Sequence, residues 1–262
     1  MSDVKGYVDT GYLNRMAELM QHIKQQSYTL MQVRPGRQVL DVGCGPGIDT
    51  VLLAQCVGPA GHVAGVDYDP AMVAAADARA AEAGVSSWVD HQVADATSLP
   101  FADASFDACR AERMLQHLTD PPAAVAEMVR VTRPGGWVVV ADTDWGSMSL
   151  ATDEVETERR LARVKAERLL HNGYAGRRLY GWLIAAGLTS LSVQPFVIYQ
   201  TQLAMARYGM SMDELQREAL AAGAVTADEL ARLESSLDKA EEAGQFFGSV
   251  NVWLVAGQKG VV

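Results

Sequence analysis

The sequence has few features of secreted or membrane-spanning proteins. Only 3 of its 262 residues are cysteine. Cys44, Cys56 and Cys109 form no CxxC pair and lie in hydrophobic stretches, so we expect reduced, buried side chains. No stretch approaches the roughly 20 apolar residues that cross a bilayer, and residues 1–7 lack the basic and apolar segments of a secretory signal. These absences predict a cytoplasmic protein without a membrane span.

Positive charge is also scarce. The chain has 22 Lys and Arg against 32 Asp and Glu, which gives a net charge of −10. Nucleic-acid backbones are bound by basic surfaces, so no nucleic-acid partner is expected. The five histidines form no HxH or HxxxH pair, so we expect no metal cofactor. One helix carries a basic cluster with interleaved glutamates, which predicts a solvated face. Its basic residues are Arg159, Arg160, Arg163, Lys165 and Arg168.

Short valine-rich runs alternate with helical patterns from about residue 37 onward. Asp69 before Pro70, and Asp120 before Pro121, have the composition of helix N-termini. Alternation of strands and helices predicts a parallel sheet covered on both faces. The strands are expected at residues 38–42, 62–67, 88–94, 106–110, 137–141, 191–200 and 250–255, and the helices at 48–57, 70–83, 121–132, 152–171 and 177–186.

The last third of the chain changes character. Ser211 with Glu214, and Thr226 with Glu229, have the spacing of capping boxes that each open a helix. No repeat, linker or domain break is visible. We therefore expect a single domain over residues 1–262, with its core at 35–145. Residues 1–34 and 202–248 are expected to form a helical cap over it.

The most informative segment is DVGCGPG at residues 41–47. A strand leads into a tight turn with glycine at alternate positions, where the missing side chains let the backbone approach a ligand. Asp67 follows Gly47 by twenty residues, at the end of the second strand. That position suits a carboxylate that accepts hydrogen bonds from both hydroxyls of a ribose.

Two ligands fit these features, a nicotinamide dinucleotide and an adenosyl sulfonium. The dinucleotide fingerprint G-x-G-x-x-G requires a third glycine where this chain has Ile48. Asp41 also places negative charge near a site that would have to hold a pyrophosphate, whereas a cationic ligand tolerates it. The electrostatics favour the adenosyl sulfonium.

The same segment resembles the first motif of class I S-adenosylmethionine-dependent methyltransferases. Four further blocks agree in order and spacing: GVDYDPAM at 65–72, VADA with LPF at 93–101, FD at 106–107 with LQHL at 115–118, and RPGG at 133–136. The resemblance covers roughly residues 35–145 and is similar to the subgroup that methylates quinones, polyketides and other small metabolites. It implies a Rossmann-like α/β fold with a seven-stranded, mostly parallel sheet, an antiparallel last strand and a helical cap.

The resemblance also implies roles for individual residues. Gly43, Gly45 and Gly47 would line the methionine and sulfonium end of S-adenosylmethionine, and Asp67 would hold the ribose. Around the adenine, Tyr68 and Met72 would contact the ring, Asp95 would accept from the exocyclic amine, and the Ala96 amide would face the ring edge. Arg110, or its backbone, would meet the amino-acid moiety.

The methyl acceptor is expected where the carboxyl ends of the strands meet the cap. Methyl transfer is a direct displacement, so the protein's main task is to align the reactants and exclude water. His117 is the tentative general base, because its pKa lies in a useful range. Asp144, Trp145, Tyr7 and Tyr12 are candidates for the acceptor pocket. Met205, Met210 and Met212 are expected either to line that pocket or to serve as packing.

The sequence leaves alternatives open. A protein that binds S-adenosylmethionine without transferring its methyl group, such as a cyclase or regulator, would show the same motifs. An NAD-dependent oxidoreductase is disfavoured by Ile48 and Asp95. The sequence does not specify the acceptor, whether O, N or C is methylated, or the oligomeric state.

Overall fold

The computed structural model describes residue 11 and residues 20–261, so Tyr7 and Tyr12 lie outside the described residues. Within them the strands form one seven-stranded sheet in the order β3-β2-β1-β4-β5-β7-β6. Strands β1 to β5 run parallel, and β7 is antiparallel to both neighbours. This confirms the predicted Rossmann-like fold. The strands are β1 (Gln38–Val42), β2 (His62–Asp67), β3 (Val89–Val93), β4 (Phe106–Glu112), β5 (Thr132–Leu150), β6 (Thr189–Gln200) and β7 (Gly248–Gln258).

Helices cover both faces of the sheet. Successive side chains of a strand point to opposite faces, and in the buried strands the residues on both faces are apolar. On β1, Leu40 and Val42 pack with helices α5 (Pro121–Val131) and α7 (Ala175–Ala185). Val39 faces the other way, toward α2 (Gln21–Leu30), α3 (Ile48–Val57) and α4 (Pro70–Glu82). Both cores end at the carboxyl edge of the parallel strands, where the glycine turn lies.

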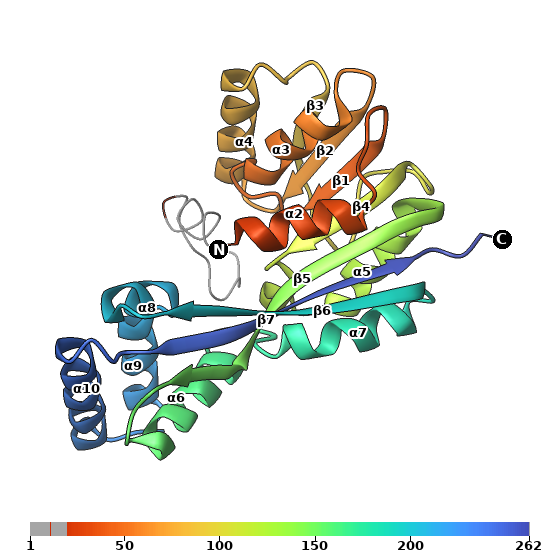
Figure 1. Cartoon of the computed structure of the whole chain (residues 1–262). Coiled ribbons are helices and arrows are strands. Elements are labelled where there is room, and N and C mark those ends of the chain that lie inside the picture. Colours follow the sequence, from red (N-terminus) through yellow and green to blue (C-terminus); the bar gives the residue numbers. More distant parts are fainter. Residues whose placement is uncertain (1–10, 12–19, 262) are drawn as a thin grey trace.

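The long strands β5, β6 and β7 extend beyond the two-faced part of the sheet and carry a third cluster of helices at their far end (Figure 1). This cluster is built on Met148 and Leu150 of β5, both buried. Its helices are α6 (Val155–Glu167), α8 (Leu203–Gly209), α9 (Met212–Ala221) and α10 (Ala227–Glu242). The segment of residues 202–248 therefore packs with α6 and the end of β5 into an apolar cluster of its own, beside the two cores that flank the parallel strands.

Helices begin at all four positions that the sequence signals predict, and three of the four caps form as expected. Asp69 accepts the Ala71 N–H and Asp120 the Ala123 N–H, in each case before a proline. Thr226 forms the predicted capping box with Glu229. The predicted box at Ser211 is wrong, because Ser211 has a φ of 51° and its side chain makes no cap hydrogen bond. Across the described chain, no helix combines the length and apolarity needed to cross a membrane.

Two further expectations need correction. Cys56 is exposed on α3, whereas Cys44 and Cys109 are buried as expected. Strand β5 runs from Thr132 to Leu150, well past the predicted 137–141, and the RPGG segment lies within it as an irregularity. The pairing there jumps from Phe106↔Thr132 to Ala108↔Trp137. The predicted turn is thus a bulge that realigns β5 with β4.

Candidate active site

The glycine turn connects β1 to α3 and is shaped by left-handed backbone conformations. Gly43, Gly45 and Gly47 have φ values of 73°, 53° and 75°. The Gly43 and Cys44 N–H groups both donate to the Val66 carbonyl, 2.8 and 2.9 Å away, which fixes the turn to β2. L-residues with side chains rarely adopt this region, so the turn conformation requires glycine.

The glycines of this turn have different neighbours. A Cβ on Gly43 would lie 2.6 Å from Met114 Cγ, so only glycine lets the turn pack under the segment that follows β4. A Cβ on Gly47 would lie 2.8 Å from Ala76 Cα in α4. Gly43 and Gly45 line the large cavity described below. Gly47 does not contribute to the described part of the cavity wall. Gly47 therefore packs the turn onto α4, which differs from its predicted place at the ligand.

Asp67 at the end of β2 holds the turn from the side. Its Oδ2 accepts the Gly45 N–H at 2.8 Å, and its Oδ1 accepts the Asp69 N–H at 3.0 Å. Burial raises the pKa of this carboxyl, and the two backbone donors partly offset that rise. Each oxygen retains a lone pair, and the side chain lines the cavity. Asp67 can therefore accept two further hydrogen bonds from a ligand.

A cavity of about 690 Å³ opens at this edge of the sheet, within the range typical of small-molecule sites. Five of the predicted cofactor residues besides Gly43 and Gly45 line it. Met72 is buried and Tyr68 is exposed beside it. Asp95 is held in place by Thr97, whose backbone N–H and hydroxyl both donate to its Oδ1. The five are Asp67, Tyr68, Met72, Asp95 and Ala96.

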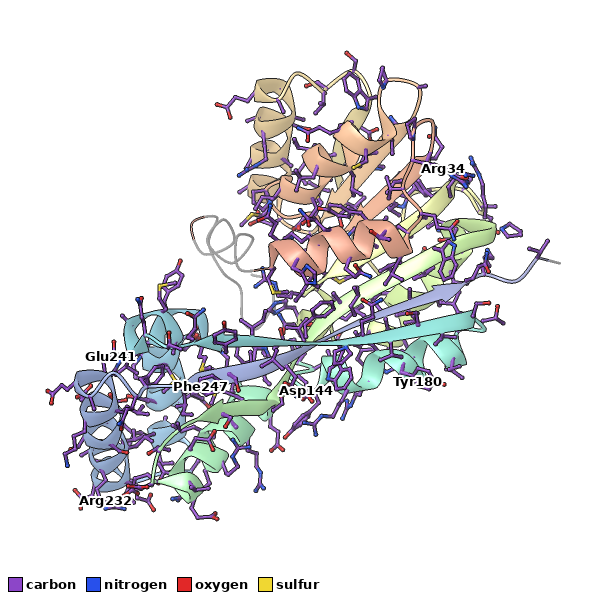
Figure 2. The ribbon with its side chains drawn as sticks, viewed as in Figure 1. Arg34, Asp144, Tyr180, Arg232, Glu241 and Phe247 are labelled. Carbon is purple, nitrogen blue, oxygen red and sulfur yellow. The ribbon has the colours of Figure 1, made fainter. Side chains whose placement is uncertain are left out.

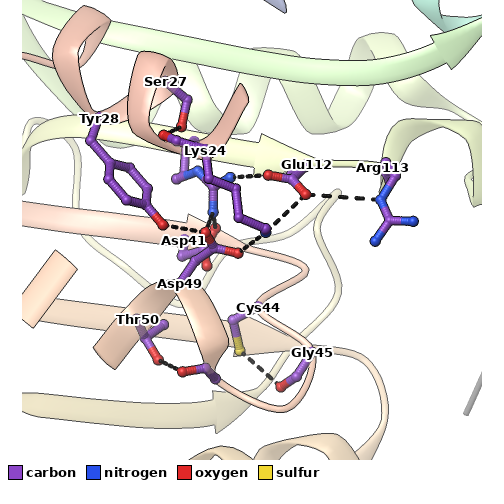
Figure 3. Close-up of polar contacts among 12 residues, drawn as sticks. Lys24, Ser27, Tyr28, Asp41, Cys44, Gly45, Asp49, Thr50, Glu112 and Arg113 are labelled. Atoms are coloured by element: carbon purple, nitrogen blue, oxygen red, sulfur yellow. Dashed lines mark hydrogen bonds and ion pairs between the residues drawn. The ribbon is translucent and has the colours of Figure 1, made fainter. Parts of the chain in front are cut away.

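Arg110 does not lie in the cavity wall as predicted but beneath it. Its guanidinium is buried and pairs with Asp41 and Asp49 at 3.2 Å each and with Glu112 at 2.6 Å. Lys24 of α2 bridges Asp49 and Glu112 (Figure 3). This network, residues 24, 41, 49, 110 and 112 with Tyr28, joins α2 to the glycine turn and β4. Arg110 therefore positions the floor of the site.

The network changes the expected role of Asp41 as the negative charge near the ligand. Burial raises the pKa of Asp41, and Arg110 offsets only part of that rise. The same Arg110 and Lys24 hold the pKa of Asp49 below its usual range, against the effect of burial. In the described part of the cavity wall, the network contributes the carboxylate of Glu112 and not that of Asp41. The sequence did not single out Glu112.

The segment after β4 forms the middle of the cavity. Arg113 has a left-handed φ of 50°, a strained conformation for a long side chain, and the backbone bond from its N–H to the Ala141 carbonyl holds it there. Gln116 follows in a short 3-10 helix, Leu115–His117. Its side-chain nitrogen lies 3.1 Å from His117 Nε2 and its oxygen accepts the Trp145 Nε1–H at 2.8 Å. His117 and Trp145 are therefore both oriented by Gln116, and both line the cavity.

Asp144 does not line the cavity, so its predicted place in the acceptor pocket is wrong. Its carboxylate is buried and accepts the Arg177 Nε–H at 2.7 Å, toward α7. In Figure 2 it lies where the long strands pass between the two helical regions. Along β5, neighbouring residues point to opposite faces, so Trp145 reaches the cavity and Asp144 does not.

The far half of the cavity is formed by α6 and α9. Lys165 lies here with an exposed fraction of 7%, which corrects its predicted place on a solvated face. The arginines of the same basic cluster do lie outside and mostly pair with glutamates. Leu169 and Leu170 add apolar surface. The remaining members of this half are His171, Ser211 and Glu214.

A smaller cavity of about 60 Å³ adjoins the large one, and Arg113 and Trp145 line both. Met205 and Met210 of the residue 202–248 segment line the smaller cavity. Met212 is almost fully buried in the apolar core of that segment. Two of the three methionines are thus close to the site, and the third serves packing.

The described residues fit S-adenosylmethionine. The glycine turn leaves room for close approach of a ligand to the backbone at Gly43, and Asp67 offers two carboxylate oxygens for a diol. Asp95 offers a further acceptor, and Glu112 brings negative charge toward a cationic ligand. A pyrophosphate would meet these carboxylates instead of the basic or amide donors that bind phosphate.

Comparison with known proteins agrees with this geometry. Residues 40–140 match the family described as "Methyltransferase domain". An uncharacterized 37.1 kDa protein in a transposon of Streptomyces fradiae is 32% identical over 252 residues, which are 95% of this chain and 71% of that protein. The demethylmenaquinone methyltransferase of Bacillus velezensis is 33% identical over 146 residues, which are 55% of this chain and 62% of that enzyme.

A solved structure of the YcgJ protein from Bacillus subtilis shares the fold. It has a TM-score of 0.64 and 23% identity, and the match covers 92% of this chain and 99% of that one. The chain belongs to the class I S-adenosylmethionine-dependent methyltransferases. S-adenosylmethionine is the cofactor of this family. The matched segment of residues 40–140 includes the glycine turn, Asp67, Asp95 and His117.

Proposed function

We propose that the protein transfers the methyl group of S-adenosylmethionine to a small, partly apolar metabolite. The observation that supports this most is the continuity of one cavity. It runs from Asp67 and Asp95 past His117 to Trp145 and to Leu169 and Leu170, which follow α6. One end has the polar groups that suit an adenosine, and the other adds the apolar surface of Trp145, Leu169 and Leu170 to a few polar side chains. The acceptor occupies the second half.

The bound cofactor supplies a methyl group on a positively charged sulfur that is already an activated leaving group. The chain's own residues orient the acceptor and keep water out. Trp145 is suited to this because Gln116 fixes its ring and because it is nearly fully buried. The roles of Gly43, Gly45, Tyr68, Met72 and Ala96 toward the cofactor are part of this proposal.

His117 is proposed as the general base for acceptors that must lose a proton. The Gln116 amide faces its Nε2 at 3.1 Å, and if the amide nitrogen donates, Nε2 is an acceptor and the ring is neutral. The neutral ring carries its proton on Nδ1 and takes up a second one at Nε2, where the O–H or N–H of the acceptor replaces the hydrogen bond from Gln116. We expect His117→Ala to lower turnover by about 10²- to 10⁴-fold for such an acceptor. Unchanged turnover would remove His117 from this role.

The cap is proposed to close the acceptor half. Ser211 and Glu214 of the residue 202–248 segment line the cavity and support this proposal. The acceptor is proposed to be a small molecule and not a nucleic acid. The net charge of −10 supports this, as does the pairing of Arg160 with Glu229 and of Arg168 with Glu218.

The test is methyl transfer from S-adenosylmethionine carrying a labelled methyl group. Purified protein is incubated with pooled phenols, quinols, aromatic carboxylic acids and amines, and the label is followed in the organic phase. Quinols are included because one relative is named a demethylmenaquinone methyltransferase. Label in an extracted product, with equimolar S-adenosylhomocysteine, is the expected result. Tight S-adenosylmethionine binding without label in any pool would support a non-methylating protein instead.

A further inference from the structure

The ammonium group of Lys165 lies in the acceptor half of the cavity, and none of the described residues accepts a hydrogen bond from it. Lys165 of α6 has an exposed fraction of 7% and lines the cavity. Its Nζ lies 4.8 Å from the centre of the Trp145 ring. Within the described part of the chain, no ion pair or hydrogen bond to Lys165 is formed. An ammonium has three N–H donors, and those of Lys165 are reachable by a ligand in the cavity.

The positive charge of Lys165 is only weakly compensated by nearby carboxylates. Glu214 of α9 is the carboxylate that acts on it, but Glu214 is itself exposed and its attraction is outweighed by burial. Burial lowers the pKa of Lys165 to about 8. Leu169 and Leu170 add apolar surface to the same cavity wall. By comparison, Lys24, which is equally buried beneath the glycine turn, pairs with Asp49 and Glu112. The fold thus satisfies one buried lysine and leaves the other open to the cavity.

We propose that the methyl acceptor carries an acidic oxygen group, a carboxylate or an ionised phenol or enol, and that Lys165 binds it. This rests on the proposed methyl transfer, because it assigns Lys165 to the acceptor half of the same cavity. Trp145 offers an aromatic face beside the ammonium, which suits a flat acceptor. Lys165 acts as a specificity-determining residue: it fixes the acidic oxygen and thereby orients the acceptor.

The experiment uses isothermal titration calorimetry at pH 7 on the full chain saturated with S-adenosylhomocysteine. The probes are 2-naphthoate and its neutral counterpart 2-naphthamide, together with the smaller pair benzoate and benzamide. We expect the carboxylates to bind about tenfold to a hundredfold more tightly than the amides, as expected for one charge-assisted hydrogen bond. Lys165→Met should abolish this preference and Lys165→Arg should retain most of it.

The matched control is Arg163→Met, which removes a positive charge from the exposed face of the same helix. It should leave the preference for carboxylates unchanged. If Lys165→Met does not fold, Lys165→Gln replaces it as the neutral variant. Glu214→Gln should strengthen carboxylate binding by several-fold, because it removes the nearest competing negative charge.

The affinity for S-adenosylhomocysteine separates this inference from the proposed function. It should be the same in wild type, Lys165→Met and Arg163→Met. A wild-type chain that binds S-adenosylhomocysteine but neither carboxylate better than its amide overturns the assignment of Lys165. A preference that survives Lys165→Met does the same. A loss of S-adenosylhomocysteine affinity in Lys165→Met would place Lys165 at the cofactor instead. Failure of wild type to bind S-adenosylhomocysteine would contradict the methyltransferase proposal itself.

Discussion

The indole N–H of Trp145 donates a 2.8 Å hydrogen bond to the side-chain oxygen of Gln116. Trp145 lies on β5 and Gln116 in the segment after β4, so this bond joins two parts of the cavity wall that come from different strands. The backbone N–H of Gln116 also donates to Asp142 on β5, at 3.0 Å. The aromatic wall of the acceptor half is therefore fixed relative to the cofactor half before any ligand binds.

Gln116→Leu should destabilise the protein. The substitution leaves the buried Trp145 N–H without its acceptor, at a cost of about 1–3 kcal/mol. Gln55→Leu, on the exposed face of α3, is the control and should change stability by less than about 0.5 kcal/mol. Urea denaturation of both variants measures the difference. Equal stabilities of the two variants would show that the bond does not hold the cavity wall.

Gly43→Ala should weaken S-adenosylhomocysteine binding by more than about tenfold. The new Cβ would lie 2.6 Å from Met114 Cγ, so the turn or the segment after β4 must move. Gly84→Ala is matched in backbone strain, since Gly84 has a φ of 70° but has nothing within 4 Å of an added Cβ. Gly84→Ala should lower stability by about 1–2 kcal/mol with unchanged affinity. Calorimetry measures the affinity for S-adenosylhomocysteine, and denaturation measures the stability of both variants. Together they separate the effect of backbone strain from that of the steric clash with Met114. Equal affinities of Gly43→Ala and Gly84→Ala would contradict this account.

Asp67→Asn should weaken S-adenosylhomocysteine binding by about tenfold or more. Both carboxylate oxygens accept backbone N–H groups, from Gly45 and Asp69, and an amide nitrogen facing either donor cannot replace them. The variant therefore loses a hydrogen bond in the turn as well as an acceptor for the ligand. Asp153→Asn removes an exposed carboxylate and is the control. Wild-type affinity in Asp67→Asn would remove Asp67 from the binding site.

Lys165→Met should stabilise the protein near neutral pH. The pKa of Lys165 is lowered by burial from 10.5 to about 8 in the folded chain. Between these values the unfolded chain binds more protons than the folded one, so wild-type stability rises with pH there. The penalty of about 3 kcal/mol is complete below pH 8 and disappears toward pH 10.5.

Urea denaturation of wild type and Lys165→Met at pH 7 and at pH 9.5 measures this effect. The variant should be more stable by about 1–3 kcal/mol at pH 7, because the lost contact with Trp145 offsets part of the gain. The advantage should shrink at pH 9.5. A variant less stable than wild type at pH 7 would mean that Lys165 has a structural role.

Much of the fold was predictable because its signals are local. The bounds of β1, β2 and α3 agree with the sequence prediction, since apolar runs there are interrupted by glycine or proline. The extension of β5 to Leu150 was not predictable. Residues 142–150 are mixed in polarity, and they are held in a strand by pairing with β7 across an irregularity between Asp144 and Ser149. Ser211 failed as a cap because its backbone is left-handed.

The cofactor half of the site was more predictable than the acceptor half. Gly43, Asp67 and Asp95 belong to motif blocks that follow one another in order along the sequence, and the structure brings them into one cavity. Arg110 was placed at the ligand because nothing local indicated that Asp41 in β1 and Asp49 in α3 are its partners. Lys165 was placed in solvent because the alternating charges of α6 predict an exposed face. The packing of α6 between β5 and α9, which buries Lys165, depends on contacts distant in sequence.

Titration of the purified chain with S-adenosylmethionine and, separately, with NAD tests the central claim most directly. The electrostatics of Glu112, Asp67 and Asp95 predict saturable heat with S-adenosylmethionine at one molecule per chain, and none with NAD. Saturable binding of NAD with no heat from S-adenosylmethionine would contradict the account.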